Sequence, residues 1–192
     1  MTEKRDQNPE LIIFTGPMFG GKTARLLAAL DRYQYQARKI VAFKPKMDVR
    51  YSSIDIKTHN GAGIPACSVS SGQEILEYMG SVDSDIDVVA VDEVFMIEGA
   101  AKALIHLFRL GYTIIVSSLE MSAACNPFSE VVELMPWATK IEKCPAVCSQ
   151  CQQDAYFTHR KVDNPQDEIQ VGGSDLYEPR CWGCHSYTNA KL

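Results

Sequence analysis

The sequence has no apolar run long enough to cross a lipid bilayer. A membrane-spanning helix needs about 20 consecutive apolar residues, and no segment of the chain approaches that length. Residues 1–10, MTEKRDQNPE, are polar and lack the apolar centre of a secretory signal. We therefore expect a cytoplasmic protein with no membrane partner.

The chain also lacks an excess of basic residues. It has 19 Lys and Arg against 24 Asp and Glu, which gives a formal net charge of −5. Proteins that bind duplex nucleic acid usually gather positive charge to neutralise phosphates, so we expect no polymeric nucleic acid as a partner. A small anionic ligand stays compatible with this charge, because backbone amides can bind it locally.

Hydrophobic residues make up 46% of the chain, which is enough for a folded core. Buried strands are predicted for LIIFT (11–15), IVAFKP (40–45), DVVAVDE (87–93) and YTIIVSSLE (112–120). Helices are expected over 24–39, 71–80, 99–111 and the first part of 128–138, whereas 46–70 looks irregular. This alternation predicts an α/β fold with a mostly parallel sheet flanked by helices.

A glycine-rich loop joins the first predicted strand to the first predicted helix. It reads GPMFGGKT and matches the P-loop pattern G-x4-G-K-[ST] in full. In such loops the backbone N–H groups bind phosphates, the Lys reaches the β- and γ-phosphates of ATP, and the Thr ligates Mg²⁺. The predicted phosphate-binding residues are Gly16, Pro17, Met18, Phe19, Gly20, Gly21, Lys22 and Thr23.

Two acidic residues follow the third predicted strand, at the sheet end where ligands gather in α/β folds. Asp92 suits the Mg²⁺ of a bound triphosphate, and Glu93 suits a general base that acts on an acceptor hydroxyl or on water. Asp48 and Arg50 follow the second predicted strand, where they could join the Mg²⁺ water shell and bind a phosphoryl group. By spacing alone, a surface salt bridge remains the simpler explanation for Asp48 and Arg50.

The chain has seven cysteines, and most of them fall near its C-terminal end. Two C-x2-C pairs predict a structural Zn²⁺ site without an open coordination position, with the ligands Cys148, Cys151, Cys181 and Cys184. A redox role is the weaker interpretation, because it is typical of a single C-x2-C pair. Short apolar runs around these pairs suggest a segment that needs a metal to hold it. We therefore predict two units, a P-loop core over 1–143 and a zinc-binding unit over 144–192.

In their order and spacing, these motifs resemble the type II thymidine kinase family. The resemblance extends from about Leu11 to Tyr187 and is carried by GPMFGGKT, DVRYSS, the DE after VVAV, NPF (126–128), AVCSQC and VGGSDLYEPRCWGC. It implies transfer of the γ-phosphate of ATP to the 5′-hydroxyl of thymidine or a related pyrimidine deoxynucleoside. It also implies a homotetramer and feedback inhibition by dTTP.

The same resemblance implies roles for individual residues. Glu93 corresponds to the catalytic base of the family, and Asp48 and Arg50 correspond to residues near Mg²⁺ and the phosphates. The segment between the cysteine pairs corresponds to a lasso that closes over the base and binds it largely through backbone groups. The implied nucleoside-binding residues are Met18, Met96, Leu119, Phe128, Thr158, Val171, Gly172, Gly173 and Tyr177.

The residues around the base depart from the family pattern. Where the family has DE-[AG]-Q-F, this chain has Phe95 and Met96 in place of the Gln and the aromatic residue. Where the family has L-D-G-x-F, it has LEMSA, which loses a second aromatic residue at Ala123. Lost rings remove stacking area around the base, so a kinase for a different or modified pyrimidine nucleoside is an alternative.

Two further interpretations come from other functional classes. Glu93 could activate water instead of a sugar hydroxyl, which would make the chain a P-loop NTPase that hydrolyses ATP without a nucleoside acceptor. The cysteine pairs could belong to a zinc-ribbon binding module for nucleic acid, but the net charge of −5 argues against this.

Overall fold

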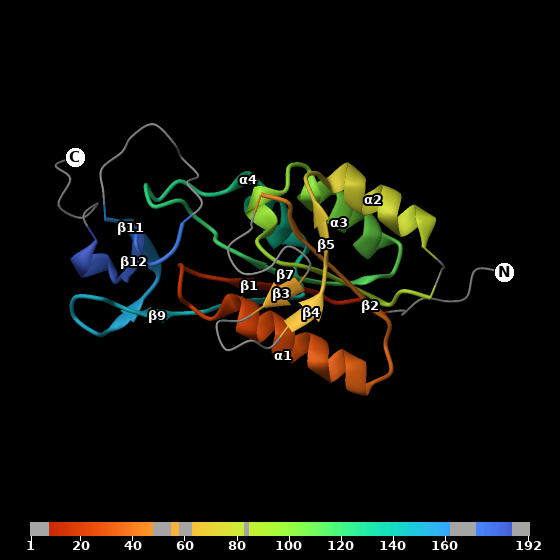
Figure 1. The fold of residues 1–192 in the computed structure, drawn as a ribbon, viewed down its shortest axis with the longest axis horizontal. Coiled ribbons are helices and arrows are strands. Elements are labelled where there is room, and N and C mark those ends of the chain that lie inside the picture. Colours follow the sequence, from red (N-terminus) through yellow and green to blue (C-terminus); the bar gives the residue numbers. More distant parts are fainter. Residues whose placement is uncertain (1–7, 48–54, 58–62, 83–84, 162–171, 186–192) are drawn as a thin grey trace.

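The structure is a computed structural model, and it describes residues 8–47, 55–57, 63–82, 85–161 and 172–185. Its centre is a six-stranded sheet with the strand order β5-β2-β6-β7-β1-β8 (Figure 1). Every neighbouring pair in this sheet is parallel. The strands are β1 (Leu11–Thr15), β2 (Ile40–Pro45), β5 (Cys67–Val69), β6 (Val88–Val91), β7 (Thr113–Ser118) and β8 (Lys140–Lys143).

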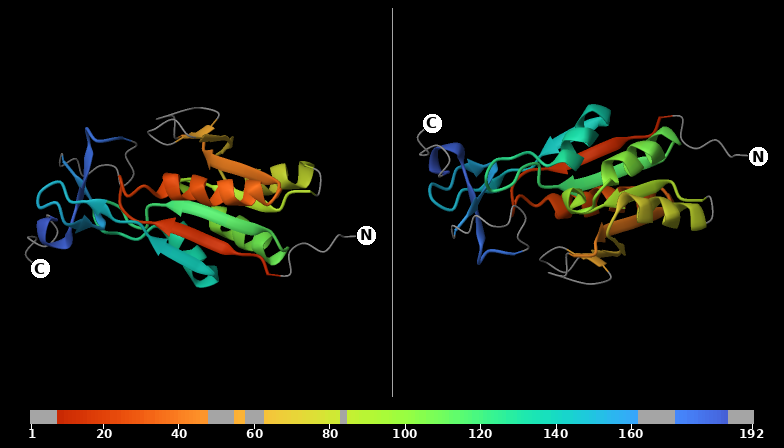
Figure 2. Two further views of the ribbon diagram at one scale, coloured as in Figure 1. Left: turned by 90° about the horizontal axis from the view of Figure 1, so that it is seen from below. Right: turned by 90° about the horizontal axis from the view of Figure 1, so that it is seen from above.

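Helices cover both faces of the sheet. Helix α1 (Lys22–Tyr35) lies on one face, and α2 (Gly72–Ser81), α3 (Ala100–Arg109) and α4 (Ser129–Leu134) lie on the other (Figure 2). Alternate residues of each strand therefore enter different cores: Ile12 and Phe14 pack in the cluster of α1, while Leu11 and Ile13 pack in the cluster of the other helices. The predicted mostly parallel sheet flanked by helices is confirmed.

Side chains close the ends of two helices. The Ser71 hydroxyl accepts a hydrogen bond from the Glu74 N–H at 3.3 Å, and the Glu74 carboxylate accepts one from the Ser70 N–H at 3.0 Å. This is a variant of the capping box in which the carboxylate reaches the residue before the N-cap Ser71, and it explains why the helix begins where the sequence predicts. The N-terminus of α3 is capped by a side chain of α4. The Glu130 carboxylate accepts hydrogen bonds from the backbone N–H groups of Gly99 and Ala101 at 2.8 and 2.7 Å.

The expectation that 46–70 is irregular was wrong. This stretch contains a small antiparallel ribbon, β3 (Asp55–Lys57) with β4 (Gly63–Pro65), and then β5, which pairs with β2 at the sheet edge. The opposite edge strand, β8, was not predicted either. These strands are three or four residues long and only partly buried. Their sequences therefore carry no clear period, and the neighbouring strand determines their conformation.

The C-terminal part lies beyond the carboxyl ends of the parallel strands (Figures 1 and 2). It contains two antiparallel ribbons, β9 (Ala146–Val147) with β10 (Asp154–Ala155) and β11 (Phe157–Arg160) with β12 (Tyr177–Arg180). Short 3₁₀ turns occur at η1 (Val94–Met96), η2 (Met135–Trp137) and η3 (Trp182–Cys184). Within the described ranges, none of the helices combines the length and the apolar character that a bilayer crossing requires.

Candidate active site and metal centre

The glycine-rich loop follows β1 and packs against Cys144, the residue after β8. A Cβ atom at Gly16 would lie 2.3 Å from the carbonyl oxygen of Cys144, and one at Gly20 would lie 2.6 Å from it. Gly16 also has a φ of 140°, a conformation that favours glycine. The Cys144 N–H in turn donates to the carbonyl of Thr15 at 2.7 Å. The loop conformation therefore depends on this close backbone contact with Cys144.

Lys22 begins helix α1 directly after the loop, and its side chain is buried. Its Nζ donates a hydrogen bond to the carbonyl of Pro17 at 2.7 Å. The ammonium group is thus folded back over the loop, where the β- and γ-phosphates of a nucleotide bind in P-loop proteins. Gly21, which precedes the helix, has a φ of 71°, so the turn into the helix also uses a left-handed residue.

Asp92 receives two hydroxyl donors at the carboxyl end of β6. The Thr23 hydroxyl lies 3.2 Å from each carboxylate oxygen, and the Ser117 hydroxyl at the end of β7 also donates to Asp92. Burial and the neighbouring Glu93 raise the pKa of Asp92 to about 7, although the Ser117 and Thr23 hydrogen bonds and Lys22 act in the opposite direction. A carboxylate beside a P-loop hydroxyl is the donor set that holds Mg²⁺ in such sites, so these residues fit the ion.

Glu93 is the next residue, and its backbone is in the left-handed region, with φ 50° and ψ 48°. For a residue with a side chain this conformation costs roughly 1–2 kcal/mol, and such strain often gathers at functional sites. The side chain is half-buried, and its Oε2 atom is shielded from solvent. Because Asp92 contacts Thr23, Glu93 lies at the same end of the sheet as the P-loop.

The four predicted zinc ligands come together. The Sγ atoms of Cys148, Cys151, Cys181 and Cys184 all lie within 4.8 Å of one another, and those of Cys151 and Cys181 are 3.5 Å apart. A tetrahedral ion with Zn–S bonds of about 2.3 Å requires S–S separations of about 3.8 Å. The arrangement therefore fits the predicted Zn²⁺ without an open position.

The pKa values of the clustered thiols diverge when no cation is bound. Burial raises the pKa of Cys148, but the backbone N–H groups of Cys151, Cys181 and Gln150 outweigh this effect and lower it to about 6. Hydrogen bonds with the Cys181 and Cys151 thiols raise the pKa of Cys184 to about 12. Without a cation these thiols compete for protons, whereas Zn²⁺ stabilises all four thiolates together.

Comparison with known proteins decides the family of this chain. A family model described as thymidine kinase matches residues 9–185. The chain belongs to the thymidine kinase family. The chain is also similar to the thymidine kinase of Ureaplasma urealyticum serovar 10 (strain ATCC 33699 / Western), with 35% identity over 185 residues, which cover 92% of this chain and 82% of the relative.

Membership of the thymidine kinase family makes the chain an enzyme, a kinase that phosphorylates thymidine with ATP. The resemblance noted from the motifs is therefore confirmed. The interpretations as a hydrolytic NTPase or as a zinc-ribbon binding module are not supported by this membership.

The residues that the thymidine kinase resemblance assigns to the nucleoside lie in two groups. Met96, Leu119 and Phe128 are half-buried and pack against the core on the side of α3 and α4. Phe95, which replaces the Gln of the family pattern, is buried, and its ring centroid lies 4.4 Å from that of Phe128. Phe95 therefore packs on one of the residues that the resemblance assigns to the base.

The second group lies on the β11–β12 ribbon of the C-terminal part. Thr158 is buried, and its hydroxyl accepts a hydrogen bond from the backbone N–H of Met18 in the P-loop at 3.0 Å. Tyr177 accepts a hydrogen bond from Arg160 at 3.2 Å and donates its own N–H to the carbonyl of Gly173 at 3.0 Å. The half-buried Gly172 precedes Gly173. Asp48, Arg50 and Val171 lie outside the described residues.

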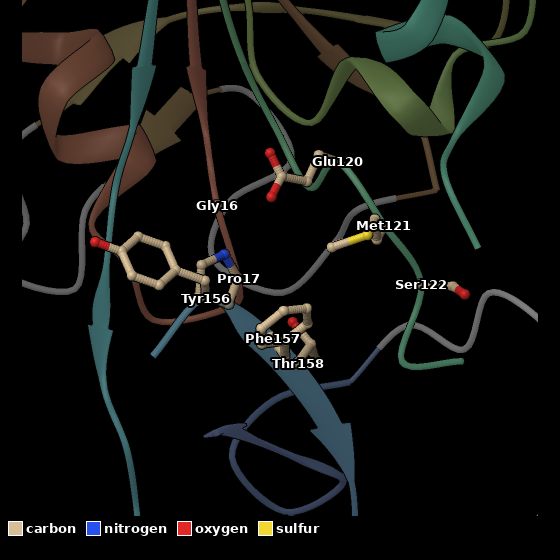
Figure 3. A pocket seen from close by; sticks show the side chains of 8 residues that line it. All are labelled: Gly16, Pro17, Glu120, Met121, Ser122, Tyr156, Phe157 and Thr158. Atoms are coloured by element: carbon tan, nitrogen blue, oxygen red, sulfur yellow. The ribbon is translucent and has the colours of Figure 1, made fainter. Parts of the chain in front are cut away.

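A small pocket opens between the P-loop, the segment after β7 and the start of β11 (Figure 3). Its lining residues are Gly16, Pro17, Glu120, Met121, Ser122, Tyr156, Phe157 and Thr158. The Glu120 carboxylate accepts a hydrogen bond from the Thr15 hydroxyl at 3.0 Å and pairs with Lys143 at 2.8 Å. Glu120 thus connects the residue before the P-loop with the end of β8.

Sequence reasoning missed two polar residues of this site, Ser117 and Glu120. Both lie where β7 ends, beside the P-loop strand β1. The usable signal was their position, because polar side chains at the carboxyl ends of buried parallel strands face the ligand site. Which of them approaches Asp92 and which approaches Thr15 depends on the strand order, which the motifs do not specify.

Proposed function

We propose that this enzyme transfers the γ-phosphate of ATP to the 5′-hydroxyl of thymidine with Glu93 as the general base. The observation that supports this proposal most strongly is the contact between the Thr23 hydroxyl and Asp92. It joins the P-loop helix to the carboxyl end of β6, and Glu93 follows there in a strained backbone conformation. A base held in this way is oriented before the substrate arrives.

The P-loop binds and orients the triphosphate in this proposal. Its backbone N–H groups and the N-terminus of α1 hold the phosphates of ATP, and Lys22 exchanges its bond to the Pro17 carbonyl for one to a phosphate oxygen. Asp92 and Thr23 would hold Mg²⁺, which neutralises the charge on the β- and γ-phosphates when it is bound. Ser117 keeps the Asp92 carboxylate oriented through its hydroxyl.

Glu93 accepts the proton of the 5′-hydroxyl as the phosphoryl group is transferred. Its side chain is half-buried, and its Oε2 atom is shielded from solvent, so water competes weakly for this oxygen. By the resemblance, Asp48 and Arg50 assist at Mg²⁺ and at the transferred phosphate.

The nucleoside lies between the two groups of residues described above. Met96, Leu119 and Phe128 offer an apolar wall for the base. The resemblance adds Met18 from the P-loop, and Thr158, Val171, Gly172, Gly173 and Tyr177 from the C-terminal part. The buried ring of Phe95 packs on Phe128 and holds that ring in place. We therefore propose thymidine as the preferred acceptor, with a related pyrimidine deoxynucleoside as the second candidate.

The remaining expectations extend this proposal. We propose a structural Zn²⁺ on the four cysteines, a core over 1–143 and a zinc-binding unit over 144–192, and a homotetramer that dTTP inhibits at the acceptor site. The cysteine cluster supports a cytoplasmic location, because metal-bound thiolates persist where thiols stay reduced. The exposed side chains of Ile141 in the edge strand β8 and of Trp137 in η2 before it offer apolar surface for contacts between subunits.

A phosphoryl-transfer assay tests the proposal. The purified enzyme is incubated with Mg²⁺ and γ-labelled ATP, and with thymidine, deoxyuridine, deoxycytidine or no nucleoside. We expect labelled dTMP as the main product and little free phosphate when no nucleoside is present. Label transfer to none of the nucleosides, with rapid release of free phosphate, would contradict the proposal.

A further inference from the structure

His185 is a buried histidine at the junction between the metal centre and the P-loop. It directly follows the zinc ligand Cys184, and only 1% of its surface is exposed. Its Nε2 atom lies 3.2 Å from the carbonyl oxygen of Thr158. Because a carbonyl only accepts hydrogen bonds, Nε2 must carry the proton and donate it to Thr158.

The carbonyl of Thr158 needs this donor because it faces the open side of its strand. Thr158 lies opposite Pro179 in the β11–β12 ribbon, and the carbonyl of Pro179 accepts from the N–H of Ser149, away from β11. The pair is therefore a non-hydrogen-bonded pair of the ladder, in which the backbone groups of both residues point outward. A buried carbonyl in this position is costly without a partner, and the imidazole of His185 supplies one.

The side chain of the same threonine reaches the P-loop. The Thr158 hydroxyl accepts a hydrogen bond from the backbone N–H of Met18 at 3.0 Å. Two hydrogen bonds thus form a continuous link from Cys184 in the metal centre through His185 and Thr158 to Met18. Each of the two side chains in this link is more than nine-tenths buried, so water competes weakly for either bond.

Aromatic neighbours fix the orientation of the imidazole. The ring centroid of His185 lies 5.7 Å from that of Phe157 and 5.5 Å from that of His159, which stands nearly perpendicular to it. Phe157 also contacts Trp182, which lies in the turn between Cys181 and Cys184; the centroids of these two rings are 5.2 Å apart. Trp182 itself is exposed.

We propose that His185 is a positioning residue through which the metal centre holds the P-loop and couples thymidine binding to ATP binding. Closure of the four cysteines around the metal fixes Cys184 and therefore His185, which holds Thr158 against Met18. Met18 belongs both to the P-loop and to the expected base pocket, so the link acts on both substrates. This inference rests on the proposed roles of these two sites and adds the connection between them.

The exchange rate of the Met18 amide hydrogen tests the link without catalysis. We compare the zinc-loaded wild-type enzyme with His185→Phe, which keeps an aromatic ring and loses the donor. The zinc content of each protein is measured in parallel. We expect roughly ten-fold faster exchange at Met18 in His185→Phe, and wild-type exchange in Trp182→Phe, the matched control from the same turn.

Calorimetric titrations measure the coupling. In His185→Phe we expect the Kd of thymidine to rise about ten-fold, which is the loss of one buried hydrogen bond. The Kd of ATP alone should change less than about two-fold, because Lys22 and Cys144 still hold the loop. The ratio between the Kd of one substrate alone and its Kd in the presence of the other substrate should fall toward one. This should hold for thymidine and for ATP, because coupling between two sites is reciprocal. His185→Gln, whose amide N–H can reach the same carbonyl, should restore much of the affinity.

Two results would overturn the proposal. The first is a zinc-loaded His185→Phe protein with unchanged exchange at Met18. The second is additivity in a double-mutant cycle on thymidine affinity, in which the effect of the double variant equals the sum of the effects of His185→Phe and Thr158→Val. Two substitutions that break the same link must have non-additive effects. If His185→Phe loses zinc, the same two criteria apply to His185→Leu, which also lacks the donor. Failure of phosphoryl transfer in the wild-type enzyme would instead overturn the proposed function and leave the exchange result untouched.

Discussion

The parallel α/β core and the cysteine-bearing C-terminal part are held together by different forces. In the core, two large clusters of buried side chains fill both faces of the sheet. In the C-terminal part, the buried cluster consists of Ala146, Cys148 and Ala155, with Cys181 and Cys184 packed against it. Apolar burial stabilises a core of the first kind, whereas a segment of the second kind needs a metal.

The chemistry divides in the same way. The core carries the P-loop, Asp92 and Glu93, while the C-terminal part carries Thr158 and Tyr177. The two parts meet where Cys144 packs on Gly16 and Gly20 and where Thr158 bonds to Met18. In the proposed mechanism, phosphate binding depends on the core alone, whereas nucleoside binding also needs the C-terminal part that carries the four cysteines. The predictions below would break or sharpen this division.

Loss of the metal should have the largest effect. Structural zinc sites contribute roughly 10–16 kcal/mol, so Cys181→Ser should unfold the C-terminal part and abolish thymidine binding measured by calorimetry. ATP binding and most of the helical circular dichroism signal should persist, because the core keeps its own buried clusters. Cys125→Ser, which changes a cysteine outside the cluster, is the control. If Cys181→Ser lost ATP binding to the same extent as thymidine binding, the two parts would not have the separate roles proposed here.

Replacement of the proposed base should have the next largest effect, and it should be confined to chemistry. Glu93→Gln keeps the size of the side chain and removes the proton acceptor, so kcat should fall about 10²- to 10⁴-fold. The Kd values of ATP and thymidine should remain near those of the wild type. Glu98→Gln, an exposed acid in the same segment, should leave kcat unchanged. A kcat for Glu93→Gln close to that of the wild type would remove this residue from the base role.

The contact between the P-loop and Cys144 should show a smaller effect on both stability and ATP binding. Gly16→Ala places a methyl group 2.3 Å from the Cys144 carbonyl oxygen in a backbone conformation with φ 140°. Overpacking of this kind costs about 1–3 kcal/mol, which denaturant unfolding can measure. Gly80→Ala, where a Cβ meets no atom within 4 Å, should be neutral or slightly stabilising. Wild-type ATP affinity in Gly16→Ala would show that the loop does not need this contact.

The ionisation of Asp92 should have the smallest effect. Its folded pKa of about 7 lies above the ordinary value of 3.8, so the protonated form stabilises the nucleotide-free fold. That contribution is complete below pH 3.8 and is lost as the pH rises through 7. The melting temperature of Asp92→Asn should therefore fall less than that of the wild type between about pH 5.5 and 8. Asp85→Asn should behave as the wild type there, because Lys39 lowers the pKa of this exposed carboxyl. Parallel curves for Asp92→Asn and the wild type would contradict this prediction.

Local patterns in the sequence were sufficient for the motifs and for the long elements. The continuous apolar runs of β1, β2 and β6 predicted buried parallel strands, because only a strand covered on both faces tolerates such runs. Ser71 marked the start of α2, and the spacing of the two cysteine pairs predicted a cluster that the structure brings together. Each of these features depends on residues that are neighbours in the chain or that repeat a known spacing.

Only the tertiary structure decided which distant residues meet. The edge strands β5 and β8 take their conformation from their neighbours, and the strand order brings Ser117 to Asp92 and Glu120 to Thr15. The bonds of His185 to Thr158 and of Thr158 to Met18 join segments that are far apart in the chain. The physical reason is that hydrogen bonding and hydrophobic periodicity act locally, whereas register and packing depend on the whole chain at once.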